Sequence, residues 1–241
     1  MSGHSKWSKV KHQKATTDVA KAAAFTKASR AITVAVKEGG GVTDPNGNFR
    51  LRLAMDKARE VNMPKDTIQR AIDKAAGEGA TVFEQVLYEG YGPGGAAILI
   101  EGATDNRNRT TSIVKNVLER GGGTLAGPGA VQFQFVKNGV LFVHKGGAGL
   151  DAMIAAGIEA GAEDVTEAED VFEVYTEPAA LYDVKQKLVA LGFSIETAEL
   201  VMNPVVPLTL TQDQQTQLGA FIDQLELLDD VQKVYTNAVW K

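Results

Sequence analysis

Cysteine is absent from this sequence of 241 residues, and histidine occurs three times. Without cysteine, disulfides, thiolate metal sites and cysteine nucleophiles are excluded. His4 and His12 stand eight residues apart, and His144 follows an apolar run by itself, so the histidines lack the spacing of metal ligands. We therefore expect no metal and no cofactor.

Long apolar runs are missing as well. No stretch approaches the roughly 20 apolar residues that a membrane-spanning helix needs. The first residues also lack the apolar segment of a signal peptide. We therefore expect no membrane contact and a cytoplasmic location.

Familiar catalytic motifs are also lacking. Gly90-x-Gly92-x-x-Gly95 matches the dinucleotide-binding string, but Pro93 interrupts it and a strand-like run follows where a helix is required. The sequence has no Walker phosphate loop, no Gly-x-Ser-x-Gly elbow and no His-Glu-x-x-His pair. We expect that the protein is not an enzyme, although a carboxylate pair assembled by the fold stays open.

Acidic residues are absent from the segment 3–14, which carries four lysines, two histidines and one tryptophan. Such a segment has too little apolar surface to fold alone. Closely spaced ammonium groups favour a polyanion, and nucleic acid is the common one. The alternative is a solvated terminus without a ligand. The predicted nucleic-acid contacts in this arm are Lys6, Trp7, Lys9, Lys11, His12 and Lys14.

The charge of the chain is divided unevenly. Residues 1–80 contain 15 basic and 8 acidic side chains, a net charge of +7, whereas residues 81–241 contain 10 basic and 22 acidic side chains, a net charge of −12. The later part would repel a phosphate backbone at distances shorter than the Debye length. We expect a polyanion to dock on one side, against the first third.

Helical periodicity dominates that first third. The pattern predicts a long helix between a cap at 16–18 and the glycines 39–41, then two shorter helices on either side of Asn62-Met63-Pro64. Basic side chains gather opposite the apolar stripe of the first helix and around the second. The predicted phosphate contacts on this helical part are Lys27, Arg30, Arg50, Arg52 and Lys65.

After Val82 the apolar pattern changes to strands alternating with helices, which predicts an α+β fold. Two small α/β sandwiches of the ferredoxin-like kind are expected. The expected strands are 83–88, 96–101, 171–175, 194–202, 205–210 and 231–235. The expected helices are 107–120, 150–160, 178–191 and 213–228. A hairpin is expected to join 131–135 to 140–143 through a turn at 137–139, and the glycine-rich loop 89–95 is expected to be irregular.

Residues 104–110 break a local rule. Thr104 or Asp105 suits a helix N-cap, yet Arg107 and Arg109 would then lie in the first turn, where the helix dipole disfavours cations. Departures of this kind tend to mark functional sites or ion pairs. One interpretation is a second cleft for RNA or a peptide, formed by Tyr88, Tyr91, Arg107 and Arg109. The other is a simple ion pair of the arginines with Asp105 or Glu101.

Several motifs together resemble the YebC/PmpR family. They include Gly3-His4-Ser5-Lys6-Trp7, Asn62-Met63-Pro64-Lys65-Asp66, the loop from Tyr88 to Gly95, and Asp105-Asn106-Arg107-Asn108-Arg109-Thr110. The resemblance covers nearly the whole chain in order. It implies three domains: a helical domain at 1–80, an α+β domain at 81–136 plus 204–241, and an α+β domain inserted at 137–203.

The resemblance implies a role in gene expression. Bacterial members resemble transcriptional regulators that bind promoter DNA, whereas relatives of a mitochondrial translational activator act on ribosomes. Three classes therefore stay open: a DNA-binding regulator, which we favour, a factor that binds ribosomal RNA and relieves stalled ribosomes, and an enzyme, which we favour least. We expect a monomer or a weak dimer.

Overall fold

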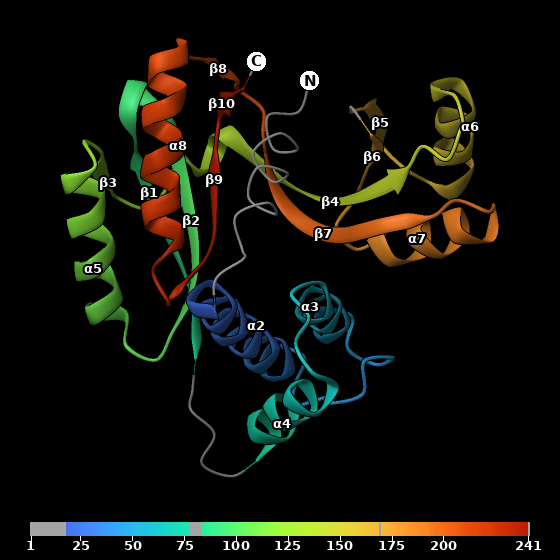
Figure 1. Cartoon of the computed structure of the whole chain (residues 1–241), viewed down its shortest axis with the longest axis horizontal. Helices are drawn as coiled ribbons and strands as arrows, with labels where there is room; N and C mark the ends of the chain where they lie inside the picture. Colours follow the sequence, from blue (N-terminus) through green and yellow to red (C-terminus); the bar gives the residue numbers. More distant parts are fainter. Residues whose placement is uncertain (1–17, 78–82, 169, 241) are drawn as a thin grey trace.

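The amino-terminal part of the structure is helical. The computed structural model describes residues 18–77, 83–168 and 170–240. The helices α2 (Asp18–Glu38), α3 (Phe49–Glu60) and α4 (Lys65–Ala76) lie together at one end of the molecule (Figure 1). We call residues 18–77 the helical unit. Its apolar side chains form a cluster of their own, which includes Ala28, Ile32, Ala35, Val36, Leu51, Ala58, Met63, Ile68, Ile72 and Ala75.

The loop between α2 and α3 is fixed by one buried amide. Asn48 caps α3, because its side-chain oxygen accepts a hydrogen bond from the Leu51 main-chain nitrogen at 3.0 Å. Its amide nitrogen donates to the carbonyl oxygens of Ala35 and Val42. One side chain therefore holds the end of α2, the loop and the start of α3 together.

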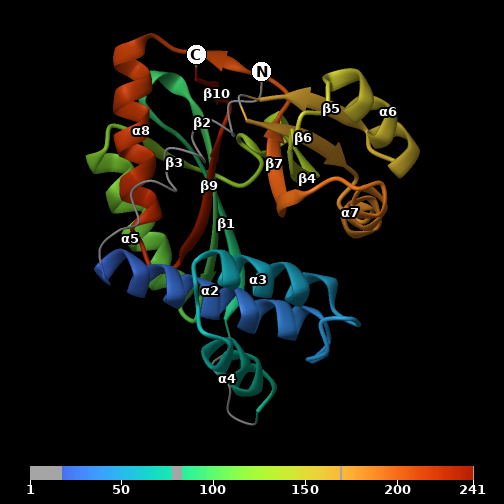
Figure 2. The same ribbon diagram turned by 45° about the vertical axis from the view of Figure 1, so that its right-hand side comes forward.

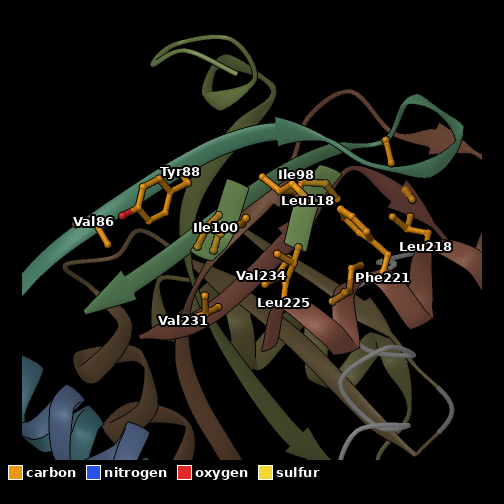
Figure 3. Packing of buried hydrophobic residues seen from close by; sticks show 14 of the residues in the cluster. Val86, Tyr88, Ile98, Ile100, Leu118, Leu218, Phe221, Leu225, Val231 and Val234 are labelled. Carbon is orange, nitrogen blue, oxygen red and sulfur yellow. The ribbon is translucent and has the colours of Figure 1, made fainter. Parts of the chain in front are cut away.

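The first sheet has the strand order β3-β1-β2-β9. Helices α5 and α8 cover one face of this sheet, and the apolar side chains of both layers interdigitate there (Figure 3). We call this sheet with its two helices the first α+β layer. Its elements are β1 (Glu84–Tyr91), β2 (Ala97–Thr104), α5 (Arg107–Arg120), β3 (Thr124–Ala126), α8 (Gln212–Glu226) and β9 (Val231–Thr236).

The second sheet has the order β5-β6-β4-β7. Helices α6 and α7 pack on one face through a further apolar cluster, and we call this sheet with its helices the second α+β layer. Its elements are β4 (Phe135–His144), α6 (Leu150–Ala160), β5 (Asp164–Glu167), β6 (Val171–Thr176), α7 (Leu181–Ala190) and β7 (Ile195–Pro204).

The two layers meet through the faces that their helices leave uncovered. One apolar cluster joins Leu99 and Tyr235 of the first sheet to Val140 and Tyr175 of the second. The chain leaves the first layer after β3, builds the second, and returns through β8 (Leu208–Thr209), which pairs in parallel with β10 (Ala238–Val239) that follows β9. The predicted α+β class with a helical first part is thus confirmed (Figure 2). The domain boundaries stay a prediction.

The expected hairpin at 131–143 is wrong. Residues 135–144 form one continuous strand, preceded by a short 3-10 turn (Gln132–Gln134). The expected turn residues pair on both sides, with Asn138 opposite Val201 and Gly139 opposite Thr176. A Cβ on Gly139 would lie 2.5 Å from the Thr176 hydroxyl oxygen. The glycine therefore serves close packing inside the sheet and not a turn.

Two other local expectations also need correction. Glu89 to Tyr91 belong to β1, so the glycine-rich loop is irregular over fewer residues than expected, and Pro93–Gly95 form a 3-10 turn. The expected strand at 205–210 shrinks to Leu208–Thr209. Pro204 and Pro207 lack the N–H group that a sheet ladder needs, and the segment passes between the two sheets.

Candidate nucleic-acid interface

The predicted arm contacts cannot be placed. Lys6, Trp7, Lys9, Lys11, His12 and Lys14 lie outside the described residues, and their roles stay predictions. The cap expected at 16–18 lies largely outside them as well. The other predicted contacts lie in the helical unit, and most of their side chains bind other groups of the protein.

Lys27 and Arg30 turn toward the first α+β layer. The ammonium of Lys27 donates to the carbonyl oxygen of Glu226 at the end of α8. The guanidinium of Arg30 donates to a carboxylate oxygen of Asp230 at 2.5 Å, and the Arg30 side chain is 17% exposed. The basic face of α2 predicted from the sequence therefore lies against the end of α8 and the segment before β9 at these two residues. Their nucleic-acid contacts stay predictions.

Arg50 and Arg52 also have intramolecular partners. Arg50 forms an ion pair with Glu38 at the end of α2. Arg52 donates to the carbonyl oxygens of Pro45 at 2.9 Å and Asn46 at 3.2 Å. These contacts do not test nucleic-acid binding, but they show that both side chains help to fix the loop between α2 and α3.

Helix α4 presents cations that have no carboxylate partner in the described part of the chain. Lys65, Arg70 and Lys74 are exposed. Among the described residues, Arg70 donates only to groups of its own helix, the Asp66 carbonyl and the Thr67 hydroxyl. Arg70 and Lys74 stand four residues apart, so they are neighbours on one helix face. Lys65 was among the contacts predicted from the sequence, whereas Arg70 and Lys74 were not, although their spacing is visible there.

The four residues of the predicted second cleft do not come together. Tyr88 is 9% exposed and belongs to the core beneath α5, with its hydroxyl 3.2 Å from that of Thr111. Tyr91 pairs with Ala97 at one end of the β1–β2 ladder, whereas Arg107 and Arg109 follow the other end, where Glu84 pairs with Thr104. Seven residues of strand span roughly 23 Å. The antiparallel register thus separates Tyr91 from the arginines.

A different set of side chains converges near the arginines. Asp230 accepts hydrogen bonds from Arg109 at 3.0 Å, from the Thr110 hydroxyl at 2.5 Å and from the Thr104 hydroxyl at 3.3 Å, in addition to Arg30. Burial alone would raise the pKa of Asp230, but the hydrogen bonds from Thr110 and Arg109 and the two guanidinium charges outweigh it and lower the pKa. Asp230 therefore stays ionised.

This network forms the wall of an open cleft of about 510 Å³ between α2, α5 and the end of α8. The cleft is lined by Arg30, Asp105, Arg109, Thr110, Ile113, Leu227, Leu228, Asp229 and Asp230.

The Asp230 network also resolves the two interpretations of residues 104–110 in part. Arg109 pairs with Asp105 at 2.7 Å and with Asp230, and the hydrogen bonds to Asp230 and Asp105 raise its pKa. The ion-pair interpretation thus holds for Arg109. Arg107 is exposed, and the described residues offer it no ion pair. The helix cap is Asn106, not Thr104 or Asp105, because its side chain accepts from the Arg109 nitrogen at 3.1 Å.

Over residues 18–77, 83–168 and 170–240 no group of three or more histidine, aspartate or glutamate side chains could hold a metal ion. No helix in these ranges is both long enough and apolar enough to cross a membrane.

Family models match nearly the entire chain. Residues 5–78 match the model described as the TACO1/YebC protein N-terminal domain, and residues 83–238 match the TACO1/YebC second and third domain. The chain belongs to the TACO1/YebC family. The resemblance inferred from the sequence motifs is thereby confirmed.

Individual relatives agree with this assignment. A protein of Citrifermentans bemidjiense named probable transcriptional regulatory protein is 46% identical, over 98% of this chain and 95% of its own length. A protein of Shewanella oneidensis with the same name is 47% identical, over 99% and 96%. A crystal structure of a conserved hypothetical protein from Aquifex aeolicus is 39% identical, covers 93% of both chains and superposes with a TM-score of 0.83.

Proposed function

We propose that this member of the TACO1/YebC family is a nucleic-acid-binding regulator of gene expression, and in the first place a DNA-binding transcriptional regulator. The observation that carries the proposal is the division of charge, +7 in residues 1–80 and −12 in residues 81–241. Relatives that match over 95% and 96% of their own length are named probable transcriptional regulatory proteins.

The arrangement of the helices supports one-sided docking. Helix α4 lies on the side of the helical unit turned away from both sheets (Figures 1 and 2). Its cations Lys65, Arg70 and Lys74 are exposed. A phosphate backbone can approach this side without meeting the repulsive charge.

A second candidate is a factor that binds ribosomal RNA. The observation that favours it is the acidic body of residues 81–241, which would restrict contact with a large RNA assembly to one surface. Sequence-specific reading of DNA would instead need side chains placed in a groove. The cytoplasm and a monomer or weak dimer stay our predictions for location and assembly.

The proposal is tested by binding a random-sequence DNA duplex over a range of salt concentrations, with sedimentation of a cell lysate in parallel. We expect salt-sensitive duplex binding and a protein that migrates apart from ribosomes. Weak duplex binding together with co-migration with ribosomes would instead support the translation factor. Failure to bind either partner would refute the proposal.

The binding face is tested with two pairs of substitutions. Lys65→Ala with Lys74→Ala removes two cations from α4, and Lys6→Ala with Lys9→Ala removes two from the arm. Each lost phosphate contact should lower the slope of log affinity against log salt by about 0.9 for duplex DNA. Arg120→Ala with Lys137→Ala is the matched control, because both side chains are exposed but belong to the acidic part. An equal loss in the control would contradict the assigned face.

A further inference from the structure

The α2 face that carries Lys27 and Arg30 is partly covered by oxygen acceptors of the first α+β layer. Arg30 binds the Asp230 carboxylate at 2.5 Å. Lys27, which lies one helical turn from Arg30 on α2, binds the Glu226 carbonyl oxygen. The Asp230 carboxylate offsets the charge of Arg30, so a phosphate must compete with this carboxylate for the guanidinium. Docking of the helical unit on the first α+β layer and phosphate binding by this face therefore compete with each other.

The helical unit can keep its fold without this contact. Its apolar cluster is built from residues of α2, α3, α4 and the turn between α3 and α4, with no residue of the α+β layers among its buried members. Interfaces between domains of one chain commonly permit relative motion unless they are large and hydrophobic.

The contacts that hold the helical unit in place include several polar ones. On the first layer these are the Lys27 and Arg30 contacts, and Arg30 also lies 5.4 Å from the centre of the Phe83 ring. On the second layer, Asp56 pairs with Lys185 at 3.5 Å, while Phe49 and Leu53 pack partly buried against its core. Ion pairs of this kind weaken when salt or a polyanion competes for their charges.

We propose that Lys27 and Arg30 form a covered nucleic-acid-binding surface, which a phosphate backbone occupies when the helical unit undocks, and that Asp230 is the competing anion. The inference rests on the proposed function. It reconciles the basic face predicted from the sequence with the covered face in the structure. Lys27 and Arg30 lie on one side of α2 about 4.5 Å apart along the axis, which suits neighbouring phosphates of one strand.

Asp229 offers a matched control for Asp230. The two acids are adjacent in the chain, but Asp229 is exposed whereas Asp230 is 7% exposed. Asp230→Asn and Asp229→Asn remove the same formal charge, so general electrostatic effects on nucleic-acid binding should be equal. A difference between the two variants reports the release of Arg30 and Arg109.

The experiment measures docking and binding separately in the full chain. Because the chain has no cysteine, Ala22→Cys on α2 and Gln224→Cys on α8, both exposed, accept spin labels at defined positions. We expect Asp230→Asn to lengthen the distance between the labels, and Asp229→Asn to leave it unchanged. A random-sequence DNA duplex should lengthen the distance in the unsubstituted background as well.

Binding of the same duplex completes the test. We expect Asp230→Asn to bind at least about threefold more tightly than Asp229→Asn at low salt, with a salt slope steeper by about 0.9 for each additional phosphate contact. The Arg30→Gln variant should have a longer label distance and yet bind the duplex more weakly than the unsubstituted chain. This variant replaces Asp230→Asn in the test if Asp230→Asn does not fold. Equal affinity of the two aspartate variants, or an unchanged distance on adding duplex, would overturn the inference. Absence of any duplex binding by the unsubstituted chain would instead count against DNA as the target in the proposed function.

Discussion

The guanidinium carbon of Arg52 lies 3.8 Å from the centre of the Tyr182 ring. Arg52 belongs to α3 and Tyr182 to α7, so this contact joins the helical unit to the second α+β layer. The same guanidinium donates to the carbonyl oxygens of Pro45 and Asn46. One side chain therefore fixes both a loop and an interface.

Arg52→Ala should lower the free energy of unfolding by roughly 1.5–3 kcal/mol, because it removes a cation–π contact and two hydrogen bonds from a charged donor. Arg52→Lys should recover little of this, since an ammonium lacks the planar surface that stacks on a ring. Urea denaturation measures the effect. Arg59→Ala is the control: Arg59 forms an exposed pair with Asp56, and its loss should cost less than about 0.5 kcal/mol. Equal losses would contradict the role of Arg52.

Glu89 holds the segment that follows β3. Its carboxylate is 4% exposed and accepts three main-chain hydrogen bonds, from Gly129 at 2.6 Å, Val131 at 2.7 Å and Gln132 at 2.8 Å. Glu89→Gln should cost about 3 kcal/mol, because the amide nitrogen would face a main-chain donor. Glu84→Gln, at an exposed position of the same strand, should have almost no effect. Thermal denaturation of both variants decides.

The stability of the protein should fall in acid partly through Glu89. Burial alone would raise the pKa of Glu89, but the main-chain donors Val131, Gly129 and Gln132 outweigh it and lower the pKa below its ordinary value of 4.5. A carboxyl group with a lowered pKa in the folded state stabilises the fold above pH 4.5, and this contribution is lost as the pH falls through the folded-state pKa. Between about pH 6 and about pH 3, a range that spans the ordinary pKa of a carboxyl group, the melting temperature should therefore drop less steeply with falling pH for Glu89→Gln than for the unsubstituted chain. Parallel curves would refute this prediction.

Gly139→Ala should destabilise the second sheet by more than about 2 kcal/mol. The added Cβ would lie 2.5 Å from the Thr176 hydroxyl oxygen and 2.9 Å from the Leu181 Cβ. Gly127→Ala is the control, because an added Cβ meets nothing within 4 Å there and φ is not positive. Its effect should stay within about 0.5 kcal/mol. A tolerated Gly139→Ala would show that β4 can shift to make room.

Trp7→Ala should weaken nucleic-acid binding by roughly 1–3 kcal/mol without changing the melting temperature, if the indole stacks on a base. Fluorescence anisotropy with a labelled single-stranded oligonucleotide, alongside calorimetry of the free protein, separates binding from folding. A large fall in melting temperature would instead identify Trp7 as a core residue.

The sequence motifs were sufficient for the family, the fold class and most helices. Apolar spacing depends on local periodicity, so α5, α6 and α8 were found within two residues of their ends. A hairpin at 131–143 was wrongly predicted in place of the continuous strand β4, because a Lys-Asn-Gly string favours a turn locally, while β6 and β7 pair with this segment from far along the chain. Local signals carry no information about such partners.

The amino-acid sequence by itself determined the charge asymmetry, the absence of cysteine chemistry and the amphipathic faces, because these are properties of composition and spacing. Tertiary structure decided which cations are available. Lys27, Arg30 and Lys37 share a basic face of α2. Asp230 binds Arg30 from 200 residues away in the chain, and the Glu226 carbonyl oxygen binds Lys27 from 199 residues away. An ion pair forms where the folded backbone brings opposite charges within a few ångströms, and contacts between such distant positions follow from the packing of the helical unit on the first α+β layer.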